Sequence, residues 1–353
     1  MKKQRIFYLD FIRAVATIII VVYHFNCNFQ IFNINGFNGL FYKYANGNWG
    51  EYIGVTLFFM ISGAALMYNY SDKIEPKTYI IKRFKSIYPM FWTAYFIVFL
   101  YDLCIYKTIP QIPKIKFLLT LIGVDGYFFY LSPNFYKIGE WFLGAIIFIY
   151  IVFPICRYLI KKNKKNAIQT LVIFGVIKYL LLLFYPFNIE PTRNIIVCIF
   201  TFMLGMYFVE YIKEVKLYQA VVALGLFMVL IFVKMPIDSY IILSIPGVLL
   251  FIILVYISKH FTDIRIRKPF EILSKHSYAI FLVHHVVIQK IEHRFSGMYL
   301  DNIEVFYMFY ACVIITAVLA KLLFELTNYI LKNTEEKIML KIKSKKEKLN
   351  GKV

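Results

Sequence analysis

Long apolar blocks separated by short polar connections make up most of this 353-residue chain. The blocks are about 20 residues long, the length at which an α-helix crosses the hydrocarbon core of a bilayer. Their apolar residues do not alternate with polar ones, which favours helices over the strands of a barrel. The pattern predicts ten membrane-spanning helices, at residues 8–28, 52–70, 87–106, 138–160, 168–187, 193–212, 217–234, 239–258, 277–293 and 303–331.

One further apolar segment, residues 115–131, does not fit this series because it contains Gly123, Asp125 and Gly126. We expect it to be re-entrant or to lie at the membrane interface. The predicted fold class is therefore all-α, a polytopic membrane helix bundle of about ten transmembrane helices.

The basic residues predict the orientation of this bundle. The connections 71–86, 157–167 and 259–276 hold five Lys or Arg residues each. Such residues concentrate on the cytoplasmic side of membrane proteins. An even number of spans then places both termini in the cytoplasm. We expect one transmembrane domain over residues 1–331 and a basic cytoplasmic tail over 332–353, solvated or bound to lipid headgroups.

Composition adds three exclusions. The net charge of +20 does not indicate nucleic acid, because the basic residues lie between apolar blocks and not in a patch with stacking aromatic residues. The N-terminus resembles a signal sequence, but Asp10 and Arg13 interrupt its apolar run and no cleavage site of small residues follows. The five cysteines are scattered singly, so we expect no disulfide framework.

Two side chains that are energetically unfavourable in the membrane interior, Arg13 and His24, lie inside the first apolar block. Eleven residues of α-helix come within about 20° of whole turns, so both side chains share one face, about 16 Å apart along the axis. Ionisable residues in membrane helices usually face the bundle interior or a hydrated cavity. Each alone could be structural, by reaching the interface or by packing. Together they predict a functional site.

Five short motifs follow one another along the chain. They are LDFIR, which opens an R-x10-H pair at Arg13 and His24, then GVTLFFMISGAAL (54–66), KRFKSIYPMFW (82–92), EWFLGAIIFIYIVFP (140–154) and SYAIFLVHH (277–285). In this order they resemble the acyltransferase-3 family of integral membrane acyltransferases, over nearly the whole chain. The chain departs from the family pattern at Ser86, where a second arginine is expected, and at Thr56, where many members have aspartate. It also lacks a glutamate common in the middle of the fourth motif.

The resemblance implies transfer of an acyl group, usually acetyl, from cytoplasmic acyl-CoA to a hydroxyl of an extracytoplasmic polysaccharide or lipid-linked sugar. It implies no permanently bound cofactor, with acetyl-CoA as donor substrate. The expected surroundings are the bilayer of a bacterial plasma membrane and envelope-glycan assembly partners. The abundance of Lys, Ile, Tyr, Phe and Asn agrees with an AT-rich bacterial genome.

The family motifs place catalysis at His24 and Arg13. His24 is suited to deprotonate a hydroxyl or to carry the acyl group, and Arg13 to hold a phosphate or developing negative charge. Arg83, Lys82 and Lys85 are the expected acyl-CoA-binding residues, although topology alone also accounts for basic residues at a cytoplasmic helix end. Further candidates for the cavity are Ser62, Glu140, Trp141, Tyr150 and His284.

Structural roles compete with several of these assignments. Ser62 and Gly63 are better suited to close helix packing than to nucleophilic attack, and Trp141 and Tyr150 to packing. His260, His276, His285 and His293 are assigned to loops and interfaces. We expect no metal site, because only the adjacent His284 and His285 are close in sequence, and neighbours in a helix point to different faces.

Two other functions fit a chain of this kind. The first is a polytopic transporter that exports a surface glycan, but carriers often consist of two related halves, and the sequence shows no duplication. The second is a catalytically silent assembly partner in an envelope-glycan complex. The intact Arg13 and His24 pair weighs against this silent partner, and the substitutions at Ser86 and Thr56 weigh slightly for it.

Overall fold

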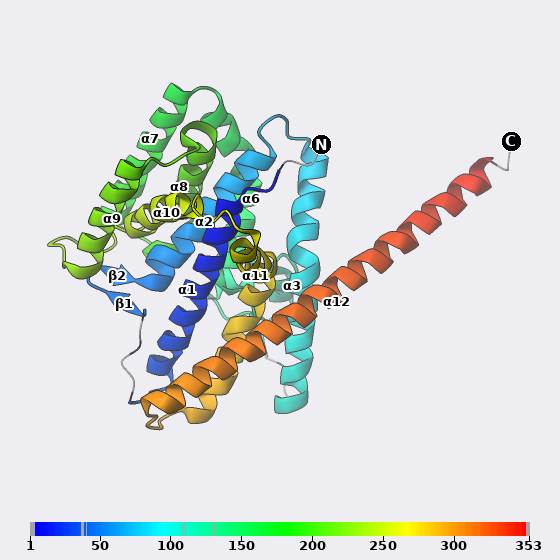
Figure 1. Ribbon diagram of the computed structural model, residues 1–353. Helices are drawn as coiled ribbons and strands as arrows, with labels where there is room; N and C mark the ends of the chain where they lie inside the picture. Colours follow the sequence, from blue (N-terminus) through cyan, green and yellow to red (C-terminus); the bar gives the residue numbers. More distant parts are fainter. Residues whose placement is uncertain are drawn as a thin grey trace.

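Helices follow the predicted apolar ranges along the chain. The computed structural model describes residues 4–36, 39, 41–107, 109, 111–129 and 131–350. The long helices in this part are α1 (Phe7–Ile31), α2 (Val55–Asn69), α3 (Pro76–Tyr106), α6 (Glu140–Lys161), α7 (Lys164–Leu183), α8 (Ile195–Tyr207), α9 (Leu217–Phe232), α10 (Ile245–Ser258), α11 (Ile264–Glu292) and α12 (Asn302–Asn350). Each of the ten predicted ranges overlaps one of them (Figure 1).

The remaining elements are short. A π-helical turn, Trp49–Gly54, leads into α2, and another, Phe208–Ile212, extends α8. The strands β1 (Lys43–Tyr44) and β2 (Gly47–Asn48) pair in antiparallel fashion. Three 3₁₀ turns lie at Lys114–Lys116, Pro191–Arg193 and His293–Phe295.

The bundle is that of a multi-pass membrane protein. Seven helical segments of the described chain are long and apolar enough to cross a bilayer: Phe7–Ile31, Trp49–Asn69, Pro76–Tyr106, Glu140–Lys161, Lys164–Leu183, Ile195–Ile212 and Asn302–Lys337. The apolar helices α9 and α10 are shorter, and α11 carries several charged residues in its first turns. The all-α membrane fold is confirmed, while the count of ten crossings and the placement of the termini stay predictions.

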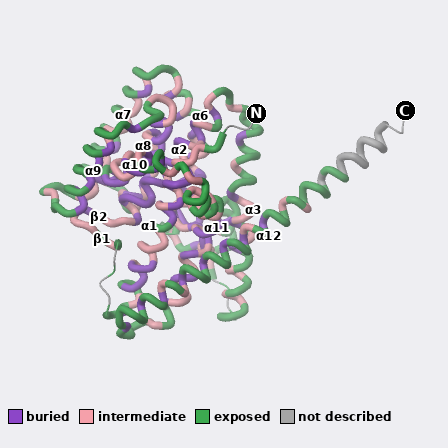
Figure 2. The backbone as a smooth tube through the Cα atoms, in the orientation of Figure 1, coloured by how far each residue is buried: buried purple, intermediate pink, exposed green. Residues whose placement is uncertain are grey.

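Apolar side chains cover much of the outer surface. On α7, only Ala167 and Lys178 are buried, although the helix is strongly apolar. Figure 2 shows exposed residues along α3 and along α12, whose C-terminal part runs away from the other helices. An apolar face that no other helix covers is what a surrounding bilayer requires.

The segment 115–131 does not form a long helix. It consists of α4 (Phe117–Leu121) and α5 (Asp125–Phe128), which are separated by Gly123 in a left-handed conformation, φ +74°. Thr120 donates a hydrogen bond of 2.9 Å to the Asp125 carboxylate and helps to hold the two pieces together. A re-entrant or interfacial placement stays a prediction.

Helix α2 lies at the centre of the bundle and approaches α8 through two glycines. A Cβ atom on Gly63 would lie 2.0 Å from the Phe202 carbonyl oxygen, and one on Gly205 would lie 1.9 Å from the Met60 oxygen. Small residues of this kind let two membrane helices pack backbone to backbone. The predicted packing role of Gly63 agrees with this geometry.

We expect Gly205→Val to lower the yield and the thermal stability of the detergent-solubilised protein. The added side chain must push α8 away from α2, which costs more than the roughly 1–3 kcal/mol typical of overpacking. Gly225→Val on α9 is the matched control, because no atom lies within 4 Å of a Cβ built there. Size-exclusion profiles after heating measure the effect. Equal stability of the two variants would contradict the close α2–α8 contact.

The helices α1 and α11 pack along much of their length and run in the same direction. Arg13 donates a hydrogen bond of 3.2 Å to Ser274. Further along the same two helices, the ring centres of His24 and His284 are 5.2 Å apart. Arg13 and His24 therefore both face α11, as their spacing predicts. The two positions define two polar sites at different depths of the bundle.

Candidate active site

The first polar site is a cluster of three side chains from three helices. His24 comes from α1, Glu140 from the first turn of α6 and His285 from α11. The Nδ1 atom of His285 lies 2.7 Å from Glu140 Oε1, and the rings of His24 and His285 are 4.9 Å apart. One carboxylate thus faces two imidazoles in a largely enclosed place, so it can stabilise a positive charge on either ring.

Backbone geometry points Glu140 at this cluster. The residue has φ +43°, a conformation that side-chain-bearing residues rarely adopt, and it follows Gly139 at φ +94°. Two successive left-handed residues turn the chain into α6. Strain of this type persists where the surrounding structure imposes it and often marks a functional site.

His284 borders the cluster and presents a free nitrogen. Its ring is buried, and Nδ1 lies 3.0 Å and 2.9 Å from the carbonyl oxygens of Ile280 and Phe281. Because a carbonyl oxygen only accepts, Nδ1 must carry the proton and Nε2 is left as an acceptor. Within the described chain, Nε2 is buried without a hydrogen-bond partner. A substrate hydroxyl or a water molecule could donate to it.

The assignment of His285 to a loop or interface is wrong. Its ring contacts His24 from the middle of α11, beside that of His284. Adjacent residues of a helix point about 100° apart. Because α1 packs against α11 between these two directions, the His24 ring of α1 contacts both His284 and His285. Only the packing of α1 on α11 shows this.

A metal ion is the obvious alternative occupant of the cluster. His24, Glu140 and His285 offer ligand atoms that all lie within 4.8 Å of one another, and two histidines with one glutamate form a common zinc set. Bonds of 2.0–2.1 Å in a tetrahedral site, however, keep ligand atoms about 3.3 Å apart. His285 Nδ1 and Glu140 Oε1 lie 2.7 Å apart, closer than two ligands of one tetrahedral ion, so the two side chains form a direct ion-pair contact. Their spacing does not match that of a bound zinc ion.

The second polar site is a cavity of about 320 Å³ near the N-terminal end of α1. Four residues singled out in the sequence line it: Arg13, Ser62, Arg83 and Tyr150. The Arg83 guanidinium lies 5.5 Å from the Tyr150 ring centre, and its Nε atom is buried with no hydrogen-bond partner in the described residues. Two arginines around one half-open cavity are suited to an anion such as a phosphate.

Neighbouring side chains hold Arg13 in place. Ser274 accepts a hydrogen bond from Arg13 and donates one of 2.7 Å to Asp10, whose carboxylate lies 3.8 Å from the Arg13 guanidinium. Arg5 pairs with the same carboxylate. The arginine is thus oriented but keeps further donors for a ligand.

The other two basic residues predicted for this site do not line it. Lys82 is exposed, and Lys85 is exposed and pairs with Glu335 of α12 at 2.6 Å. Trp141 is also absent from the wall; it packs in the core, with the Arg193 guanidinium 5.8 Å from its ring centre.

The cavity wall includes residues that the motifs did not single out for binding. They are Ser86, Ser274, Lys275, Ser277 and Tyr278. Ser86 stands where the family has an arginine, and its hydroxyl bonds the Arg83 carbonyl oxygen at 2.8 Å. Lys275 also lines the wall, with its ammonium nitrogen 5.0 Å from the ring centre of Phe324 on α12.

Aromatic rings separate the arginine cavity from the histidine cluster. Phe58, Phe142 and Phe281 line the cavity. The ring centre of Phe142 lies 5.8 Å from that of Phe58 and 5.6 Å from that of Phe281. Phe281 lies next to His284, at 6.3 Å between ring centres. These rings therefore lie between the cavity and His284.

The fold and the two sites define an integral membrane protein with an arginine-lined cavity and a histidine–carboxylate cluster along one helix seam. The acyltransferase domain model of the acyltransferase-3 family matches residues 6–325, nearly the whole chain. The chain therefore belongs to the acyltransferase-3 family and is a membrane acyltransferase. No curated protein and no solved structure matches it.

Proposed function

We propose that this acyltransferase transfers an acetyl group from cytoplasmic acetyl-CoA to a hydroxyl of an extracytoplasmic polysaccharide or lipid-linked sugar. One observation carries the proposal: Arg13 and His24 occupy two polar sites at two depths of the same α1–α11 seam. With the N-terminus in the cytoplasm, the arginine cavity opens toward the donor and the histidine cluster lies toward the acceptor. The proposed location is a bacterial plasma membrane.

The donor would bind by its phosphates. Arg13 and Arg83, with Lys275 nearby, present fixed positive charge in the cavity, and acyl-CoA is the donor substrate with no resident cofactor. The thioester arm would extend past Phe58 and Phe281 toward the histidines. Burial between helices excludes water, which strengthens these charge interactions and protects the thioester from hydrolysis.

The transfer itself would take place at His24. The acceptor hydroxyl loses its proton to the imidazole while its oxygen bonds to the thioester carbonyl carbon; the C–S bond then breaks, and the CoA thiolate leaves and takes up a proton. In a two-step variant, the His24 nitrogen attacks first and holds the acetyl group until the hydroxyl replaces it. In both, Glu140 stabilises the charge that develops on the rings.

The test is the O-acyl content of isolated surface glycans, measured by mass spectrometry. Cells with the gene, without it and with the gene restored are compared. We expect an ester mass that disappears in the deletion and returns on restoration. Unchanged acylation with less glycan at the surface of the deletion strain would instead support the exporter.

We expect Arg83→Gln to raise the KM for acetyl-CoA about 10-fold or more, because a hydrogen bond to a charged group contributes roughly 1.5–3 kcal/mol. Lys85→Gln, two residues away, should change KM less than about two-fold, since its exposed ion pair with Glu335 contributes little. Initial rates in proteoliposomes measure both. Equal effects would argue that the basic segment acts only through its overall charge.

A further inference from the structure

A small void lies between the arginine cavity and His284. It measures about 10 Å³, and its wall includes Thr17, Phe58, Ser277, Phe281 and His284. Phe58, Ser277 and Phe281 also line the arginine cavity, so they are the shared wall of the two spaces. The void is thus the space next to the cavity on the path to His284.

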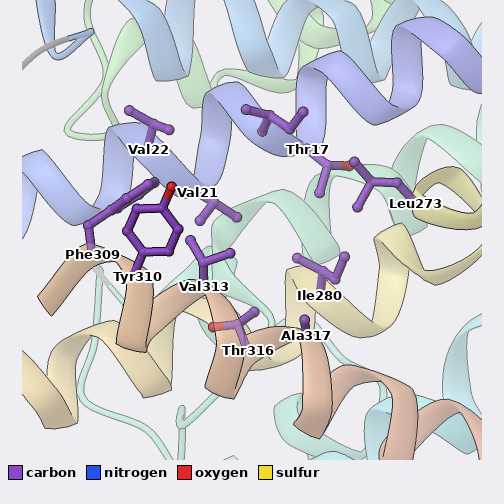
Figure 3. A pocket seen from close by; sticks show the side chains of 11 residues that line it. Thr17, Val21, Val22, Leu273, Ile280, Phe309, Tyr310, Val313, Thr316 and Ala317 are labelled. Carbon is purple, nitrogen blue, oxygen red and sulfur yellow. The ribbon is translucent and has the colours of Figure 1, made fainter. Parts of the chain in front are cut away.

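A much larger apolar groove lies on the other side of this void. It measures about 390 Å³ and runs between α1, α11 and α12 (Figure 3). Val313 and Ala317 of α12 line the groove but not the void, whereas Thr17, Val21 and Ile280 line both. Figure 3 shows Val21 of α1 and Ile280 of α11 among the side chains that line the groove. These two aliphatic side chains, together with Thr17, lie between the void and the groove because they line both.

We propose that the void receives the acyl group of the donor and that the wall of Val21 and Ile280 restricts this group to acetyl. The inference rests on the proposed acyl transfer and specifies its donor. A volume of about 10 Å³ holds one water-sized probe, which is close to the size of a methyl group. A longer chain would have to displace Val21 or Ile280 to reach the groove.

The position of the void also suits the reaction. An acyl group whose methyl end lies between Thr17 and Ile280 has its carbonyl carbon on the side of His284, and the ring of His24 lies 5.2 Å from that histidine. A tight pocket discriminates by about 10–200-fold per extra methylene. We therefore expect the wild-type protein to prefer acetyl-CoA over propionyl-CoA at least 10-fold.

The test compares the Val21→Ala and Ile280→Ala variants with the wild-type protein in proteoliposomes. Acetyl-, propionyl- and hexanoyl-CoA are supplied as donors, and the product esters are identified by mass spectrometry. Either substitution removes part of the wall and joins the void to the groove. The ratio of hexanoyl to acetyl transfer should rise at least 10-fold. Val313→Ala is the matched control, since it widens the groove on the far side and should leave the ratio unchanged.

The outcomes separate this inference from the proposed function. A wild-type protein that transfers no acyl group from any donor overturns the function. One that transfers acetyl and hexanoyl equally well overturns the acyl pocket alone, as do active alanine variants with an unchanged ratio. If the alanine variants do not fold, Ile280→Val removes a single methylene, and the ratio of propionyl to acetyl transfer must then rise.

Discussion

The His24→Ala variant is expected to lose acyl transfer by about 10²–10⁴-fold, the contribution typical of a general acid or base, and to insert into the membrane normally. Alanine removes the one ring that lies beside both His284 and His285 and faces the Glu140 carboxylate. The acyl-ester content of the product, normalised to the amount of folded protein, measures the loss.

His276→Ala is the matched control for this variant. His276 also lies on α11, but its ring packs on Phe324 of α12 away from the cluster. We expect its activity to stay within about two-fold of wild type, as for most surface substitutions. A fully active His24→Ala protein would show that His24 is not the catalytic residue.

Glu140→Gln should lower kcat about 100-fold and leave the KM for acetyl-CoA nearly unchanged. The amide keeps the shape of the side chain but removes the negative charge that lies 2.7 Å from His285 Nδ1. Loss of charge stabilisation acts on the transition state, whereas the arginine cavity that would bind the donor is untouched. Steady-state kinetics at varied acetyl-CoA separate the two constants.

Asp102→Asn serves as the comparison for Glu140→Gln. Asp102 also holds an ion-paired carboxylate, to Lys137 at 2.7 Å and Lys290 at 2.9 Å, but it does not belong to the histidine cluster. Its kcat per folded molecule should be preserved. If both substitutions lower kcat equally, Glu140 acts through stability and not through charge at the site.

The sequence predicted the elements of this fold well because each span is a long apolar run. Lipid leaves such a run few choices besides a helix, so 8–28 and 138–160 overlap α1 and α6 closely. The segment 115–131 was recognised as different because Gly123 and Asp125 interrupt it, and it forms short helices. Helical geometry alone also placed Arg13 and His24 on one face.

The prediction of the site was less complete, because binding residues depend on which helices pack together. Arg83 lines the cavity and Lys85 does not, although only one residue separates them and both belong to one basic motif. Their different directions on α3 decide this, and sequence spacing gives no information about what α3 packs against. His285 was missed for the same reason.

By itself, the sequence determined the all-α membrane class, the order of the helices and the pairing of an arginine with a histidine on the first of them. These properties depend on local hydrophobicity and on the period of one helix. Tertiary structure decided that Glu140 and His285 join His24, and that Val21 and Ile280 line a small space next to His284. Such contacts join residues more than a hundred positions apart, and they arise only when α1, α6 and α11 bury their faces against one another.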